Sequence, residues 1–210
     1  MTLERPLRLA IVLTGIAGLT LQYQVTAELF AARGLGTAAV LWKLSSYFTI
    51  LTNTLLVLAQ AICLVAPSSR PGNFFRSPSI QAALTLYILM VKIIYMSLLA
   101  KLWNPEGKQL WADLLHHHVP PLLQLLLWVA YVERAKLTWS HPFLWLSWPA
   151  SYLIWALAHG GDSPYPFLDL AHLGPLRVAL NSAAIGTAFL TGGFALLGLD
   201  HLLTPKNPAR

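Results

Sequence analysis

The chain has 210 residues, of which 56% are hydrophobic and only 10% are charged. A soluble globular domain carries about 25% charged residues, so this composition excludes an ordinary soluble protein and favours a polytopic membrane protein. The net charge of +6 is spread over the predicted loops and forms no basic stripe, which argues against nucleic acid as a partner. We expect the excess cations to contact lipid headgroups, so that membrane lipids are the partners.

The single cysteine, Cys63, lies inside an apolar run. One cysteine forms neither an intramolecular disulfide nor a cysteine-rich metal site. The sequence also lacks a Gly-x-Ser-x-Gly motif, a His-Glu-x-x-His motif and a P-loop. We therefore expect no metal and no cofactor, and nothing in the sequence indicates an oligomeric state.

Apolar runs near the roughly 20 residues that cross a bilayer core recur along the chain, separated by segments rich in turn formers such as residues 67–73. The sequence therefore predicts an all-α fold, a polytopic membrane bundle of six transmembrane helices in one domain of residues 1–210. The predicted spans cover residues 7–27, 46–66, 80–103, 116–132, 142–158 and 176–199.

Lys and Arg are unevenly distributed between the two sides of the predicted bundle, and cytoplasmic loops carry the excess of these residues. With a cytoplasmic N-terminus, the inner segments hold eight of them: Arg5, Arg8, Arg70, Arg76, Arg134, Lys136, Lys206 and Arg210. The outer segments hold five: Arg33, Lys43, Lys101, Lys108 and Arg177. This bias predicts a multi-pass protein of the cell membrane with both termini in the cytoplasm.

Alternation of the six spans brings the end of each odd span and the start of the next even one to the same side. That side, predicted to be the outer one, gathers most of the side chains capable of acid–base or nucleophilic chemistry. They are Glu28, Thr49, Asn53, Asp113, His116, His117, His118, His159, Asp169, His172 and Asn181. Polar clusters are costly against hydrocarbon, so this asymmetry indicates a site.

The best candidate pair within this group is Thr49 and His116. Thr49 lies about one turn inside the second span, and a threonine hydroxyl needs a base to act as a nucleophile at neutral pH. Asp113, three residues before His116, can share a helix face with it and fix its tautomer. Asn53, one turn below Thr49, could donate a hydrogen bond to a developing oxyanion. Which of the three consecutive histidines faces the interior stays open.

Two other functions remain open on the same residues. Lys92 in the middle of the third span, with Glu28 and the histidines, could form the relay of a proton-coupled carrier or small-solute transporter. Such carriers usually contain an inverted repeat with broken helices, which the sequence does not show. A non-catalytic membrane scaffold, in which the polar cluster only satisfies hydrogen bonds, is the third alternative.

Four segments resemble the androgen-induced-gene family of six-span membrane proteins, and more closely its bacterial relatives. They are Trp42-Lys43, Tyr47-Phe48-Thr49-Ile50, the stretch from Asp113 to Pro121, and Tyr165-Pro166-Phe167-Leu168-Asp169. Their order and spacing cover most of the chain, and the last segment is the most specific.

The resemblance implies an activity. Eukaryotic members of that family hydrolyse fatty acid esters of hydroxy fatty acids with a threonine nucleophile and a histidine. The threonine motif falls on Thr49 and the histidine, counted back from the Val-Pro segment, on His116. The expectation is a lipid-ester hydrolase acting on a fatty-acyl ester near the outer membrane interface, with Asp113 or Asp169 orienting the histidine. A shared fold does not by itself carry a substrate across such a distance.

Overall fold

The computed structural model describes residues 3–102, 104–159 and 163–205. Every regular element in these ranges is a helix, so the predicted all-α class is confirmed for the described part of the chain. Trp103, the last residue of the third predicted span, lies outside the described residues, as do Lys206 and Arg210. Contacts divide the chain into two compact units, Met1–Tyr131 and Val132–Arg210.

Four helical segments among the described residues are long and apolar enough to cross a membrane. They are α1 (Glu4–Ala31), α3 (Phe48–Val65), the segment Pro78–Leu99 and α10 (Leu170–Leu203). They match the first, second, third and sixth predicted spans, and they are typical of a membrane-embedded protein. The fourth and fifth predicted spans fall on shorter helices, α7 (Val119–Tyr131) and α9 (Ser147–His159), of 13 residues each.

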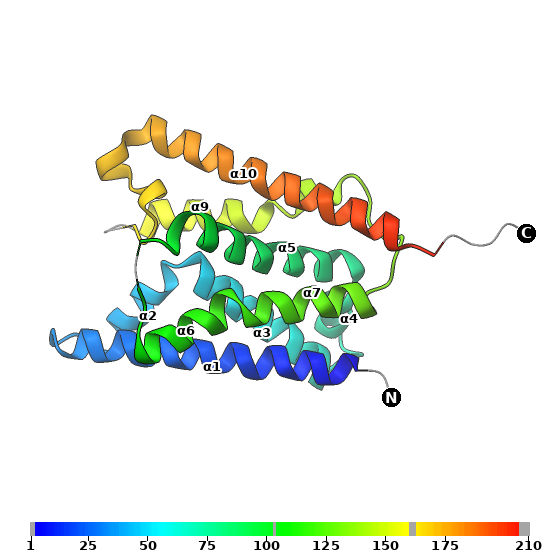
Figure 1. The fold of residues 1–210 in the computed structure, drawn as a ribbon, viewed down its shortest axis with the longest axis horizontal. Helices are drawn as coiled ribbons and strands as arrows, with labels where there is room; N and C mark the ends of the chain where they lie inside the picture. The colour runs from blue at the N-terminus through cyan, green and yellow to red at the C-terminus, as the bar shows by residue number, and fades with distance from the viewer. Residues whose placement is uncertain (1–2, 103, 160–162, 206–210) are drawn as a thin grey trace, which may run out of the picture. The chain divides into compact units, whose positions relative to one another are not determined.

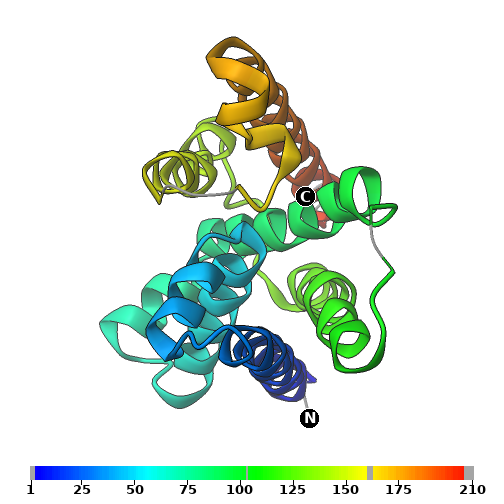
Figure 2. The same ribbon diagram turned by 90° about the vertical axis from the view of Figure 1, so that its left-hand side faces the viewer.

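The first unit is built on α1, α3, the segment Pro78–Leu99 and a rod made of two shorter helices, packed side by side. The segment Pro78–Leu99 comprises α5 (Pro78–Ile94) and a π-helical turn, η1 (Tyr95–Leu99). Together with α6 (Gly107–His117), α7 forms a rod that runs along α1 in the opposite direction (Figure 1). Figure 2 shows this unit from one end, with α3 beside α1 and α5 packed against α3 and α7. Two short helices, α2 (Thr37–Ser45) and α4 (Arg70–Arg76), lead into α3 and α5.

The rod of α6 and α7 is broken at His118. Its φ and ψ of −121° and −54° depart from helical values. Pro120 and Pro121 follow, and proline has no N–H to donate to the carbonyls of His116 and His117 four residues earlier. Both prolines therefore fall in the first turn of α7, where they are tolerated. The helix expected to begin at residue 116 begins at Gly107, and His116 lies in its last turn.

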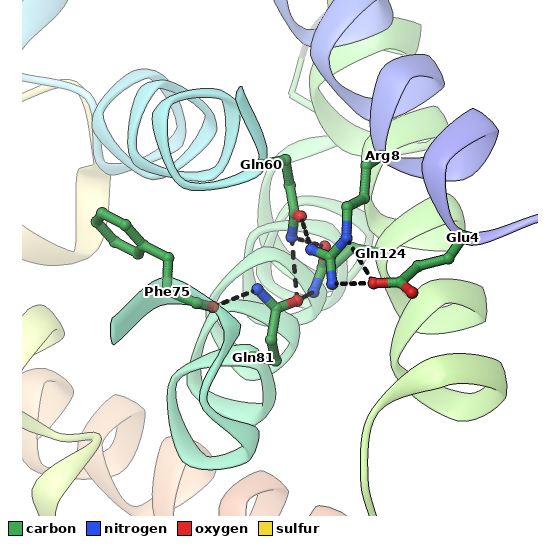
Figure 3. Close-up of polar contacts among 6 residues, drawn as sticks. All are labelled: Glu4, Arg8, Gln60, Phe75, Gln81 and Gln124. Atoms are coloured by element: carbon green, nitrogen blue, oxygen red, sulfur yellow. Dashed lines mark hydrogen bonds and ion pairs between the residues drawn. The ribbon is translucent and has the colours of Figure 1, made fainter. Parts of the chain in front are cut away.

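One end of the first unit holds a buried polar network that links α1, α3, α5 and α7 (Figure 3). Gln60 donates to Gln81 at 3.1 Å and to Gln124 at 2.8 Å, and it accepts a hydrogen bond from Arg8. The three glutamines are fully buried. Arg8 also donates to the carboxylate of Glu4 at 2.9 Å, and Gln81 donates to the main-chain carbonyl of Phe75 at 2.6 Å. Interhelical amide bonds of this kind hold membrane helices together.

The second unit contains α8 (His141–Leu144), α9, η2 (Pro166–Leu168) and α10. Gly193 lets α10 approach α8 closely, because a Cβ there would lie 3.0 Å from Cβ of Pro142. Asp200, 1% exposed, accepts hydrogen bonds from Arg134 and from the N–H of Ala135. These contacts fasten the start of the second unit to the C-terminal part of α10.

Candidate functional site

The first unit links the main chains of Thr49 and His116 through a third residue, Asn53. The Asn53 side-chain amide donates to the carbonyl of Thr49 at 2.9 Å, one turn earlier on α3. It also donates to the carbonyl of His116 at 3.4 Å, on α6. Both of its N–H groups are therefore directed at main chain, and Asn53 is fully buried. Thr49 itself is half-buried in the first turn of α3.

This arrangement differs from the role predicted for Asn53. An amide whose two hydrogens bind main-chain carbonyls does not donate to an oxyanion as well. The atom it leaves without a described partner is the acceptor Oδ1. Asn53 therefore acts as a clamp that holds the start of α3 against the end of α6.

His116 is 2% exposed, and neither ring nitrogen has a hydrogen-bond partner among the described residues. Its ring lies against α1 at Gly18, where a Cβ would come within 3.2 Å of Cε1 and 3.4 Å of Nδ1 of the histidine. The same Cβ would lie 3.0 Å from Cβ of Leu115, so a larger residue than glycine here would require these neighbours to shift by a few tenths of an ångström. An imidazole buried in this way has an unused proton-accepting nitrogen, which is the requirement for a general base.

Asp113 does not orient His116 as expected. Its partners are Tyr95, whose hydroxyl donates to Oδ2 at 2.7 Å, and His117, whose Nδ1 lies 3.3 Å from Oδ1. His117 Nδ1 also donates to the main-chain carbonyl of Asp113 at 3.1 Å. Residues three and four apart are both neighbours on a helix, so helix geometry allows either histidine; here Asp113 pairs with His117, while the ring of His116 lies against Gly18 of α1.

Tyr95 contacts both Asp113 and His117. Its ring stacks on that of His117 with centroids 3.8 Å apart and an interplanar angle of 13°. Tyr95 opens the π-helical turn η1, a type of irregularity that is frequent at functional sites.

Lys92 and His118 form a further contact next to this cluster. The Lys92 ammonium donates to Nδ1 of His118 at 3.1 Å, and both side chains are half-buried. The three histidines thus have three different environments: His116 faces α1, His117 faces Asp113 and Tyr95, and His118 faces Lys92. Among the described residues, no three His, Cys, Asp or Glu side chains form a group that could hold a metal ion.

Asp169, also expected to support the histidine, lies in the second unit and has other partners. Its side chain caps α10 by accepting from the N–H of His172 at 3.1 Å, and it binds Nδ1 of His172 at 2.7 Å. The hydrogen bonds from the main chain and side chain of His172 lower the pKa of Asp169. The structure thus gives Asp169 a capping role in α10.

Sequence reasoning missed Tyr95, Gly18 and the glutamine network. Gln60, Gln81 and Gln124 each stand in an apolar segment, and an amide in hydrocarbon needs a partner, so one glutamine in each of three spans was an available signal. Tyr95 and Gly18 give no comparable signal, because an aromatic residue or a glycine in a membrane helix has many roles.

Comparison with protein-family models, with curated proteins and with solved structures finds no match to this chain.

Proposed function

We propose that this protein is an integral membrane hydrolase of lipid esters, with Thr49 as nucleophile and His116 as general base. In this proposal six helices cross the cell membrane and both termini are cytoplasmic. The observation that carries it is the Asn53 clamp, which binds the main chain of Thr49 and of His116 with one side-chain amide. The substrate is a fatty-acyl ester that enters from the membrane.

Helix lengths support the six-span arrangement. A helix rises about 1.5 Å per residue and the hydrocarbon core is about 30 Å thick. The α6–α7 rod, from Gly107 to Tyr131, is then roughly 37 Å long, and the pair α8 and α9, from His141 to His159, roughly 28 Å. The α6–α7 rod is thus longer than the core, and the α8–α9 pair is close to its thickness, whereas α7 and α9, at 13 residues each, are much shorter.

The chemistry follows from the residues. Thr49 Oγ1 attacks the ester carbonyl carbon while its proton passes to a ring nitrogen of His116. The tetrahedral intermediate collapses, the C–O bond to the alcohol breaks, and His116 returns the proton to the leaving oxygen. A water molecule then attacks the acyl-enzyme with His116 again as base, which frees the acid and restores Thr49.

The test uses purified protein in detergent, a serine-hydrolase-type covalent probe such as a fluorophosphonate, and fatty-acyl ester hydrolysis. Thr49→Ala and His116→Gln are expected to abolish labelling and hydrolysis, and Thr49→Ser to retain both because the hydroxyl remains. Thr54→Ala is the matched control on α3, since Thr54 only bonds the Ile50 carbonyl one turn earlier. Undiminished labelling of Thr49→Ala would remove Thr49 as the nucleophile.

A proton-coupled carrier is the second candidate, favoured by the contact between Lys92 and His118. Ionisable groups paired in this way inside a membrane protein often mark proton pathways. Proteoliposome flux that falls with Lys92→Met and is unaffected by Thr49→Ala would support the carrier over the hydrolase. Loss of stability alone in both variants would support a scaffold.

A further inference from the structure

The cluster of Asp113, Tyr95 and His117 has no role in the proposed hydrolysis, although the structure builds it in detail. His117 is held on one edge by Asp113 at two atoms and on one face by the stacked ring of Tyr95. The Nδ1–H of His117 donates to the main-chain carbonyl of Asp113, so Nε2 is left as its proton acceptor, and the Asp113 carboxylate 3.3 Å from Nδ1 stabilises the cation once a proton arrives. This environment allows His117 to act as a base.

The proton balance of the proposed hydrolysis requires a group that removes a proton from His116. Hydrolysis of an ester at neutral pH yields an alcohol, a carboxylate and one proton, because the released acid has a pKa near 4 to 5. His116 handles protons within the cycle but is 2% exposed. One proton per turnover must therefore leave a buried ring through a neighbouring group.

His117 is placed to receive it. The rings of His116 and His117 meet edge to face with centroids 6.4 Å apart, a separation that one water molecule can bridge. The His117 side chain is 11% exposed, against 5% for Asp113. Tyr95 also faces this ring, and its own ring meets that of His118, the partner of Lys92, edge to face.

We propose that His117, held by Asp113 and Tyr95, takes the product proton from His116 and passes it to solvent. His117 acts through His116 and does not touch the substrate. In this step an N–H bond of the His116 imidazolium breaks, a proton passes through one water, and an N–H bond forms at His117 Nε2. The proton then leaves to water or buffer. The inference rests on the proposed hydrolase function.

The test is chemical rescue by a small buffer. At low buffer concentration His117→Gln is expected to slow steady-state hydrolysis of a fatty-acyl ester by roughly tenfold to a hundredfold, the lower range for a lost acid–base group. Imidazole added at fixed pH and ionic strength should restore the rate, because it takes the place of His117 as the proton acceptor. Asp113→Asn should show the same pattern, and Tyr95→Phe a weaker one. A structural defect would not respond to imidazole.

The matched control is His172→Gln, which removes the histidine of the exposed Asp169–His172 pair in the second unit. It should hydrolyse at the wild-type rate with no imidazole effect. A wild-type rate for His117→Gln at low buffer, or a loss that imidazole does not restore, would overturn the inference while Thr49→Ala still abolishes hydrolysis. Absent wild-type hydrolysis, or full activity in Thr49→Ala, would instead overturn the proposed function and this inference with it.

Discussion

The side-chain amide of Asn53 donates to the main-chain carbonyl of His116 across 3.4 Å, and this bond joins α3 to the last turn of α6. The acceptor at this position is available because α6 ends at His117 and Pro120 and Pro121 follow. A helix lacks partners for its last four carbonyls, and the proline pair removes N–H donors that could have served them. Asn53 supplies one of the missing donors from a neighbouring helix.

Replacing Asn53 by Ala should therefore show how much the positioning of Thr49 and His116 contributes to the rate, since both side chains remain. Thr49 and His116 both remain, but the clamp between them is lost, and a displacement of about 1 Å can cost about a hundredfold in rate. We expect hydrolysis to fall by that order while the unfolding midpoint in detergent drops only moderately. Thr54→Ala is the control on the same helix. Hydrolysis by Asn53→Ala at the wild-type rate would show that the clamp is not needed.

The glutamine network should behave as a structural unit. Gln60→Leu leaves Arg8, Gln81 and Gln124 each without one partner in a buried site. An unsatisfied buried polar group costs about 1–3 kcal/mol, so the variant should unfold more readily in a denaturant titration in detergent. Fluorophosphonate labelling of the folded fraction should stay unchanged, because Gln60 lies seven residues, or roughly 10 Å, along α3 from Asn53. Loss of labelling in the folded fraction would contradict this separation.

Close packing of α1 on α3 gives a test by double mutation. A Cβ at Gly15 would overlap Cγ2 of Val57, closer than side-chain atoms approach in real structures. Gly15→Ala should destabilise the first unit by about 1–3 kcal/mol, the usual cost of overpacking. Adding Val57→Ala removes the obstructing methyl, so the double variant should be more stable than the sum of the single changes predicts. Simple additivity would indicate that α1 shifts to accommodate the methyl.

Asp169 gives a pH dependence with a defined sign. Its folded-state pKa is lowered by the hydrogen bonds from His172, so its contribution to stability is fully present above the unfolded value of about 3.9. It is lost as the pH falls through the folded value. Asp169→Asn keeps an N-cap acceptor but not the charge. The difference in unfolding midpoint between wild type and variant should therefore shrink below about pH 4, and a constant difference would contradict the assignment.

The sequence by itself determined the all-α class and the apolar segments that match α1, α3, α5 and α10, because the length and hydrophobicity of a membrane helix are local properties. It also singled out Thr49, Asn53 and His116, since polar residues at the ends of apolar runs are conspicuous there. Three relationships were decided only by the tertiary structure: the donation of Asn53 to main chain, the pairing of Asp113 with His117, and the distinct neighbours of the three histidines. Each depends on how one helix is rotated against another, and that rotation is set by packing between distant segments, as at Gly18 and Tyr95.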